Sequence, residues 1–152
     1  MAIQLKKQAY EKIIRHLVFI EENKNDIMDT LLHNGTFSSK LTSHSFIKSY
    51  IKRVEAVLTN ITLVEQEMFS EDYNSLPFII IGSSFTLIDK SKTRHFCRLT
   101  SDIYGKTAGA VNNIYAFSES GVEILMKEKN ASCILDLGGG FGEYVINSIT
   151  VS

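Results

Sequence analysis

The stretch IKSYIKRVEAVL, residues 47–58, decides the fold of the N-terminal half. Its apolar residues recur at steps of three and four, the period that places side chains on one face of an amphipathic helix. The seam and its continuation comprise Ile47, Tyr50 or Ile51, Val54, Leu58, Ile61 and Val64. Lysine, arginine and serine lie between them, so the sequence predicts a long helix with one buried face.

A second apolar seam runs through the preceding residues. Its members are Leu5, Ala9, Ile13, Leu17, Ile20, Ile27 and Leu31. Each seam spans roughly 25 residues without proline, or about 35 to 40 Å at the helical rise. The polar residues 33–36 and 38–39 between the seams allow the chain to reverse. We therefore expect residues 1–75 to form an antiparallel coiled-coil hairpin.

The pattern changes at Pro77, the only proline, which predicts a domain boundary. Short runs of β-branched and aromatic residues then predict strands. They cover residues 78–81, 85–88, 95–99, 114–117, 133–137 and 144–151, with a turn at 82–84. Ser120 and Glu123 have the S-x-x-E spacing of a capping box, which predicts one helix reaching Lys129. The fold class is thus α+β, with a small antiparallel sheet domain in residues 76–152.

Composition excludes several classes of protein. The chain carries 16 Lys and Arg against 17 Asp and Glu, a formal net charge of −1. This balance argues against bulk electrostatic affinity for nucleic acid or anionic lipid, so a binding function must rest on local patches. Sequence-specific nucleic-acid binding is not expected. No apolar run could cross a bilayer and no secretion signal is recognisable, so a cytoplasmic location is expected. Cys97 and Cys133 lack metal-ligand spacing and predict buried reduced thiols, and neither a cofactor nor a bound metal is expected.

The glycine-rich stretch ILDLGGGFG, residues 134–142, is similar to the first motif of S-adenosylmethionine methyltransferases. That motif must open a helix and lead to a parallel strand carrying a ribose-binding acid about 20 residues later. Only ten residues follow Gly142, and they have a strand pattern. A hairpin loop between two antiparallel strands is therefore predicted instead.

Four segments together resemble the Gre family of bacterial transcript-cleavage factors. Residues 45–58, SFIKSYIKRVEAVL, are similar to the family's G-F-I-E-G-R-I-K-E-I-E-A-K-L, and residues 81–89, IGSSFTLID, to F-G-S-x-V-T-V-x-D. Residues 118–127 stand where the family has S-P-x-G/A-x-A-L-x-G-K, and residues 139–146 correspond to its P-G-G-x-x-x-Y-x-I ending. The resemblance covers nearly the whole chain in order. It implies a coiled-coil hairpin followed by an FKBP-like domain.

The resemblance also implies a partner. Gre factors dock the C-terminal domain at the rim of the secondary channel of RNA polymerase and insert the coiled coil toward the active site. Cleaving members carry D-x-x-E-N near the tip, and its two carboxylates help to hold a second Mg²⁺. The match places Thr30 at the Asp position, His33 at the Glu position and Asn34 at the Asn position. Both acids are missing, and no acidic residue lies between Asp29 and Glu55.

Three interpretations of this tip remain open. Asp29 could replace one acid, but a one-residue shift turns a helical side chain by about 100° and leaves no second carboxylate. His33 with His44 could bind a transition metal, although isolated histidines on a polar turn are usually solvated. Alternatively, Lys40 and the cations behind it would be attracted to the polymerase's acidic metal centre or to phosphates, unless they only solubilise the helix.

The resemblance assigns polymerase docking to the turn before the small domain's helix, residues Ser118, Glu119, Ser120 and Gly121. Glu119 replaces the family's proline, and the two serines could equally be a turn and a cap residue. We therefore predict a non-enzymatic protein that binds RNA polymerase at the secondary channel and modulates transcription without stimulating cleavage, as an inhibitor or competitor of Gre factors. The alternatives are a genuine cleavage factor, an interaction module with another partner, or a peptidyl-prolyl isomerase.

Overall fold

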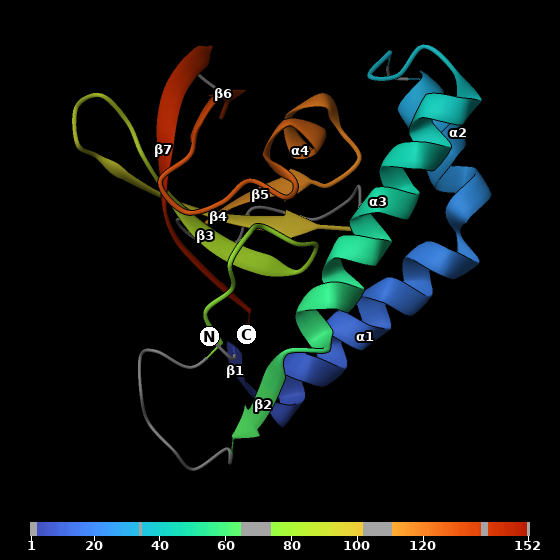
Figure 1. The fold of residues 1–152 in the computed structure, drawn as a ribbon. Coiled ribbons are helices and arrows are strands. Elements are labelled where there is room, and N and C mark those ends of the chain that lie inside the picture. Colours follow the sequence, from blue (N-terminus) through green and yellow to red (C-terminus); the bar gives the residue numbers. More distant parts are fainter. Residues whose placement is uncertain (1–2, 34, 65–73, 102–110, 138–139, 152) are drawn as a thin grey trace. The chain divides into compact units, whose positions relative to one another are not determined.

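The computed structural model describes residues 3–33, 35–64, 74–101, 111–137 and 140–151. The chain divides into two compact units, Met1–Ser75 and Leu76–Ser152, each described by itself (Figure 1). Within the described residues, every helix is too short or too polar to span a membrane.

The first unit is a helical hairpin whose flanking segments pair as strands. Its elements are β1 (Ile3–Lys6), α1 (Lys7–Glu22), α2 (Lys24–His33), α3 (Lys40–Leu58) and β2 (Ile61–Val64). α3 returns alongside the two preceding helices (Figure 1). The apolar seams are buried from Ala9 to Leu31 on α1 and α2 and from Ile47 to Val54 on α3, whereas Leu58, Ile61 and Val64 of the second predicted seam are only half-buried.

The start of the first predicted seam and the end of the second predicted seam form strands instead of helix. β1 and β2 pair in parallel, with Ile3 opposite Ile61 and Lys6 opposite Val64. Leu5, which the seam placed on the first helix, is fully buried in β1 instead. The second helix ends at Leu58 because a run of β-branched and apolar residues follows and finds a strand partner.

The first predicted helix is divided in two at Asn23. Asn23 is the C-cap residue of α1, with a non-helical backbone at φ −112° and ψ 20°, and its side-chain Nδ2 donates to the Phe19 carbonyl oxygen at 2.8 Å. The step from Ile20 to Ile27 fits an unbroken helix equally well, so apolar periodicity could not reveal the break.

Within its described residues, the second unit is a five-stranded sheet with one short helix. Its elements are β3 (Ser83–Ile88), β4 (Arg94–Thr100), β5 (Val111–Tyr115), α4 (Glu119–Ile124), β6 (Ser132–Asp136) and β7 (Phe141–Val151). The strand order is β5-β4-β3-β7-β6, and α4 lies against β5 and β6 (Figure 1). The α+β class and the single short helix are confirmed.

The sheet is mixed, whereas an antiparallel sheet was predicted. β4 and β5 pair in parallel, with Phe96 opposite Val111 and Thr100 opposite Tyr115. The other three pairs are antiparallel, including β6 with β7, where Asp136 lies opposite Phe141. The hairpin predicted for the glycine-rich stretch is therefore confirmed, although Gly138 and Gly139 lie outside the described residues.

Residues 78–81 do not form the predicted strand, whereas a turn is present at the start of the predicted turn at 82–84. All four residues are buried, and Ile79 exchanges backbone hydrogen bonds with the segment after α4. Its N–H donates to the Lys127 carbonyl at 2.9 Å, and its carbonyl accepts from Met126 at 2.8 Å. β3 starts only at Ser83, after a turn in which Gly82 has a φ of +90°.

The inner face of the sheet supplies the second core. Phe85, Leu87, Leu99, Leu135 and Ile146 are all buried there. Cys97 and Cys133 are also buried and free, as predicted. Burial raises the pKa of the Cys97 thiol to about 12 and that of the Cys133 thiol to about 11, so both stay protonated at neutral pH.

Candidate functional site

The end of the helical hairpin holds the residues predicted for the tip. Thr30 and His33 lie in the last turns of α2, and Lys40 is the first residue of α3. Asp29, His33 and Lys40 are exposed, while Asn34 lies outside the described residues. The Thr30 hydroxyl donates to the carbonyl oxygen of Asp26 at 2.9 Å, so it is occupied within its own helix.

Apolar contacts and a helix cap close this tip. The rings of Phe37 and Phe46 lie 5.1 Å apart. The Ser39 side chain caps α3 by accepting from the Thr42 N–H at 3.2 Å. Gly35 has a φ of +77°, and a Cβ added there would meet nothing within 4 Å. The turn is thus held at its flanks and open at its apex.

One tip residue was missed by the sequence analysis. Leu41 follows Lys40 in the first turn of α3 and is 75% exposed. It lies off the buried seam, and an apolar residue off the seam was the available signal. The tip therefore presents an apolar side chain beside a cation. In the described part of the chain, no group of three or more His, Cys, Asp or Glu residues is arranged to hold a metal ion.

Two of the four predicted docking residues, Glu119 and Ser120, border a hollow of about 300 Å³ on the second unit. Its lining is formed by Glu119, Ser120 and Glu123 of α4, Ile134 of β6 and Phe141 of β7. Phe141 is 76% exposed and Ile134 is 62% exposed. We call this the α4 groove. It combines two carboxylates with two exposed apolar side chains, which suits a partner surface that is basic and apolar.

Ser118 and Gly121 fix the start of α4, the helix that lines the α4 groove. The Ser118 hydroxyl donates to the Tyr115 carbonyl at 2.7 Å, and its oxygen accepts from the Gly121 N–H at 3.0 Å. Gly121 is buried, and a Cβ at this position would lie 2.0 Å from the Tyr115 carbonyl oxygen. Glycine is therefore required by close backbone packing.

The predicted helix cap was assigned to the wrong serine. Ser118, not Ser120, is the N-cap of α4, and the helix ends at Ile124 rather than near Lys129. The S-x-x-E pattern fits Ser120 in sequence, but Ser118 is the residue with the extended backbone of an N-cap, at φ −82° and ψ 169°. Ser120 is left free to line the α4 groove.

Ile134 and Phe141 line the α4 groove but were not among the predicted site residues. Both alternate along their strands with residues that turn inward, and Ile134 stands between buried Cys133 and Leu135. That period of two places Ile134 on the outer face and could have revealed it.

Comparison with known proteins gives matches to solved structures alone, since neither a family model nor a curated protein matches the sequence. The chain is similar to GreA factor homolog 1 (Gfh1) of Thermus thermophilus, at 20% identity over 98% of this chain and 99% of that chain, with a TM-score of 0.45. It is similar to Thermus aquaticus Gfh1, at 18% identity over 98% of both chains, with a TM-score of 0.42.

A further similarity is to the transcription elongation factor GreA/GreB from Nitrosomonas europaea. The identity is 15% over 97% of this chain and 98% of that chain, with a TM-score of 0.44. All three similarities extend along nearly the whole chain. Since each TM-score is below 0.5, they carry no inference about function.

Proposed function

We propose that the chain binds RNA polymerase at its secondary channel and modulates transcription without stimulating transcript cleavage. The resemblance of residues 45–58 and 81–89 to Gre motifs supports the partner. The α4 groove supports a docking surface on the second unit, because two exposed apolar side chains lie beside Glu119 and Glu123.

The observation that carries the non-cleaving role is the chemistry of the tip. The positions that resemble the family's two acids hold Thr30 and His33, at the end of α2. Two-metal hydrolysis needs hard anionic oxygen ligands, and neither side chain is one. Exposed Lys40 and Leu41 stand there instead. A cation at this place would be attracted to an acidic metal centre rather than donate a ligand to it.

Transcript shortening on backtracked elongation complexes tests the role, with an intact Gre factor as the positive control. We expect no cleavage above background from this chain and inhibition of cleavage by the control factor. Robust cleavage at low protein concentration would show that the proposal is wrong.

Restoring the acids tests whether the tip reaches the active site. We expect Thr30→Asp with His33→Glu to confer some cleavage. Ser45→Asp with Ser49→Glu adds the same two carboxylates on exposed positions of α3 and should confer none. Equal cleavage by both double variants would mean that added charge, not tip position, is responsible.

Binding is tested separately by pull-down of purified polymerase. Phe141→Ser should weaken binding because it removes the most exposed apolar side chain of the α4 groove. Phe96→Ser is the matched control, since Phe96 is 53% exposed on β4 and lies outside the groove. Absence of any polymerase binding by the unchanged chain would contradict the partner.

A further inference from the structure

Four cationic side chains and one aromatic side chain occupy every second position along the hairpin that joins β3 to β4. Every second residue from 90 to 98 gives Lys90, Lys92, Arg94, Phe96 and Arg98, with no acidic residue between them. All five are exposed. Side chains two apart in a strand point to the same face, so Arg94, Phe96 and Arg98 share one face of β4, while Lys90 and Lys92 lie in the turn before it. We call these five residues the basic stripe.

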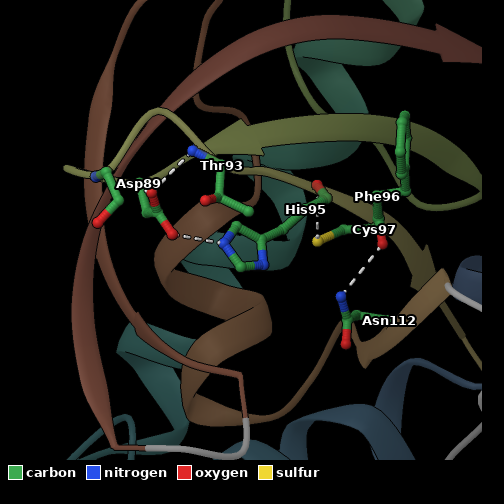
Figure 2. A network of polar contacts seen from close by, with 7 residues as sticks. Asp89, Thr93, His95, Phe96, Cys97 and Asn112 are labelled. Carbon is green, nitrogen blue, oxygen red and sulfur yellow. Dashed lines mark hydrogen bonds and ion pairs between the residues drawn. The ribbon is translucent and has the colours of Figure 1, made fainter.

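The other face of β4 belongs to the core. Cys97 and Leu99 are buried, and the His95 ring packs edge-on against Tyr144 at 5.4 Å between centroids. Figure 2 shows the rings of Phe96 and His95 on opposite sides of the strand. Phe96, 53% exposed on the outer face, is therefore not part of the core on the other side of β4.

Polar contacts fix the backbone that carries the stripe. The Asp89 carboxylate accepts from the Thr93 N–H at 3.0 Å and lies 2.9 Å from His95 Nε2, across the turn (Figure 2). On the next strand, Asn112 Nδ2 donates to the Phe96 carbonyl at 3.3 Å (Figure 2). The backbone that carries the stripe is thus fixed before a ligand binds, which lowers the entropic cost of binding.

Two shallow hollows adjoin the stripe along β3. One, of about 240 Å³, is lined by Ser84, Thr86, Phe96, Arg98, Ser148 and Thr150. The other, of about 420 Å³, is lined by Ile88, Asp89, Lys90, Lys92, Glu143 and Val145. Ser84, Thr86 and Ile88 share the outer face of β3, so the two hollows follow one another beside the stripe.

The charges of the stripe are available to a ligand. Within the described residues, neither Arg94 nor Arg98 has an ion-pair partner. Lys90 lies 3.2 Å from Glu143, but both side chains are largely exposed and such a pair is weak. The outer face of β4 therefore attracts anions.

The arginine, hydroxyl and aromatic side chains of this face are suited to the phosphates, sugars and bases of a single nucleic-acid strand. Arginine binds phosphate through two parallel hydrogen bonds, and hydroxyl side chains bond phosphate and sugar oxygens. An exposed aromatic ring stacks on an unpaired base. Alternate side chains on a strand stand about 6.6 Å apart, so successive members of the stripe can contact successive parts of a flexible chain.

We propose that the outer face of β4 and β3 binds a short single-stranded nucleic acid, with Arg94 and Arg98 on its phosphates and Phe96 stacked on a base. This site is distinct from the tip and the α4 groove and needs no polymerase. An acidic protein segment would satisfy the arginines but leave the aromatic ring without a stacking partner.

Fluorescence anisotropy with the full chain, no polymerase and a labelled oligouridylate of about 12 nucleotides tests the site. We expect binding at low salt, weakened about 5- to 100-fold by Phe96→Ala through loss of base stacking. Arg94→Ser with Arg98→Ser should reduce the slope of log affinity against log salt by about 1.4, or about 0.7 per phosphate contact. Arg15→Ser with Lys129→Ser removes two exposed cations elsewhere and should leave the slope unchanged.

Competition identifies the ligand class. We expect an unlabelled duplex of equal length and an oligoglutamate of equal charge to compete at least tenfold more weakly than oligouridylate. Equal competition by oligoglutamate, unchanged affinity of Phe96→Ala, or no oligouridylate binding at low salt would each overturn the proposal. Phe96→Leu keeps an apolar side chain without an aromatic face and should bind as weakly as Phe96→Ala, which separates stacking from any loss of folding.

Discussion

The turns that precede α3 and α4 both end in a serine N-cap, but the two serines differ in their surroundings. Each has a serine N-cap whose oxygen accepts from a backbone N–H three residues on, Ser39 from Thr42 and Ser118 from Gly121. Ser39 is exposed, whereas Ser118 is half-buried and also donates to the Tyr115 carbonyl. One turn forms the tip of the helical hairpin, and the other leads into α4, which lines the α4 groove.

The two glycines at these turns sharpen the contrast. A Cβ on Gly35 would meet nothing, whereas a Cβ on Gly121 would collide with the backbone at Tyr115 and Ala116. A substitution at Gly35 therefore disturbs little packing, whereas a substitution at Gly121 disturbs closely packed backbone.

The largest effect is expected at Gly121. Gly121→Ala should lower the free energy of unfolding by about 3 kcal/mol or more, because the methyl group overlaps backbone atoms that cannot move independently. Gly35→Ala, the matched change at the tip, should cost only about 1 kcal/mol, from the left-handed backbone alone. Urea denaturation measures both. Similar costs at the two positions would show that the turns do not differ in packing.

A smaller difference is expected between the two caps. Ser118→Ala should cost about 1 to 2 kcal/mol, since it removes the cap and one hydrogen bond to a carbonyl in a packed region. Ser39→Ala should cost about 0.5 to 1 kcal/mol, because water can replace an exposed cap. Thermal unfolding of both variants against the unchanged chain provides the measurement, and a larger loss for Ser39→Ala would reverse the comparison.

The tip acids are expected to have the smallest effect on folding. Thr30→Asp with His33→Glu should change the free energy of unfolding by no more than about 0.5 kcal/mol, as for most surface substitutions. The Thr30 hydroxyl bonds only within α2, and His33 is exposed. A loss above about 1 kcal/mol by denaturant titration would mean that these side chains support the tip.

The sequence could predict those helices and strands whose buried residues recur at a regular spacing along the chain. The helical seams and most strands of the second unit follow from periods of 3.6 and 2, because each buried face recurs within a few residues. The pairing of Ile3 with Ile61 could not be predicted this way, since the choice of a distant partner leaves no local period. For the same reason residues 78–81 look like a strand, although they hydrogen-bond to the segment after α4 instead.

The candidate site was only partly predictable. Thr30, His33 and Lys40 could be placed at the tip because a hairpin brings the end of one helix close to the start of the next. The α4 groove needed the fold, because Phe141 meets α4 only once β7 pairs with β6 and α4 lies against that edge. The cap at Ser118 likewise depended on backbone conformation rather than on motif spacing.

The two units are also expected to respond to acid in different pH ranges. In α1, burial lowers the pKa of His16 below its ordinary value of 6.5, and Lys12 and Arg15 lower it further. The unfolded chain therefore binds this proton more readily, so stability is present above pH 6.5 and falls as the pH drops through the folded pKa. In the sheet unit, the hydrogen bond from His95, supported by the Thr93 N–H, lowers the pKa of Asp89 below 3.8.

Asp89 thus stabilises the sheet unit above pH 3.8, and this contribution is lost only as the pH falls through the still lower folded pKa. Hydrogen exchange of backbone amides should accordingly show α1 losing protection below about pH 6.5 while β3 and β4 keep theirs until below about pH 4. His16→Gln should remove the first loss and leave the second, and Asp89→Asn should do the reverse. If both units lost protection in one pH range, and His16→Gln changed nothing, the separate response of the helical unit would be excluded.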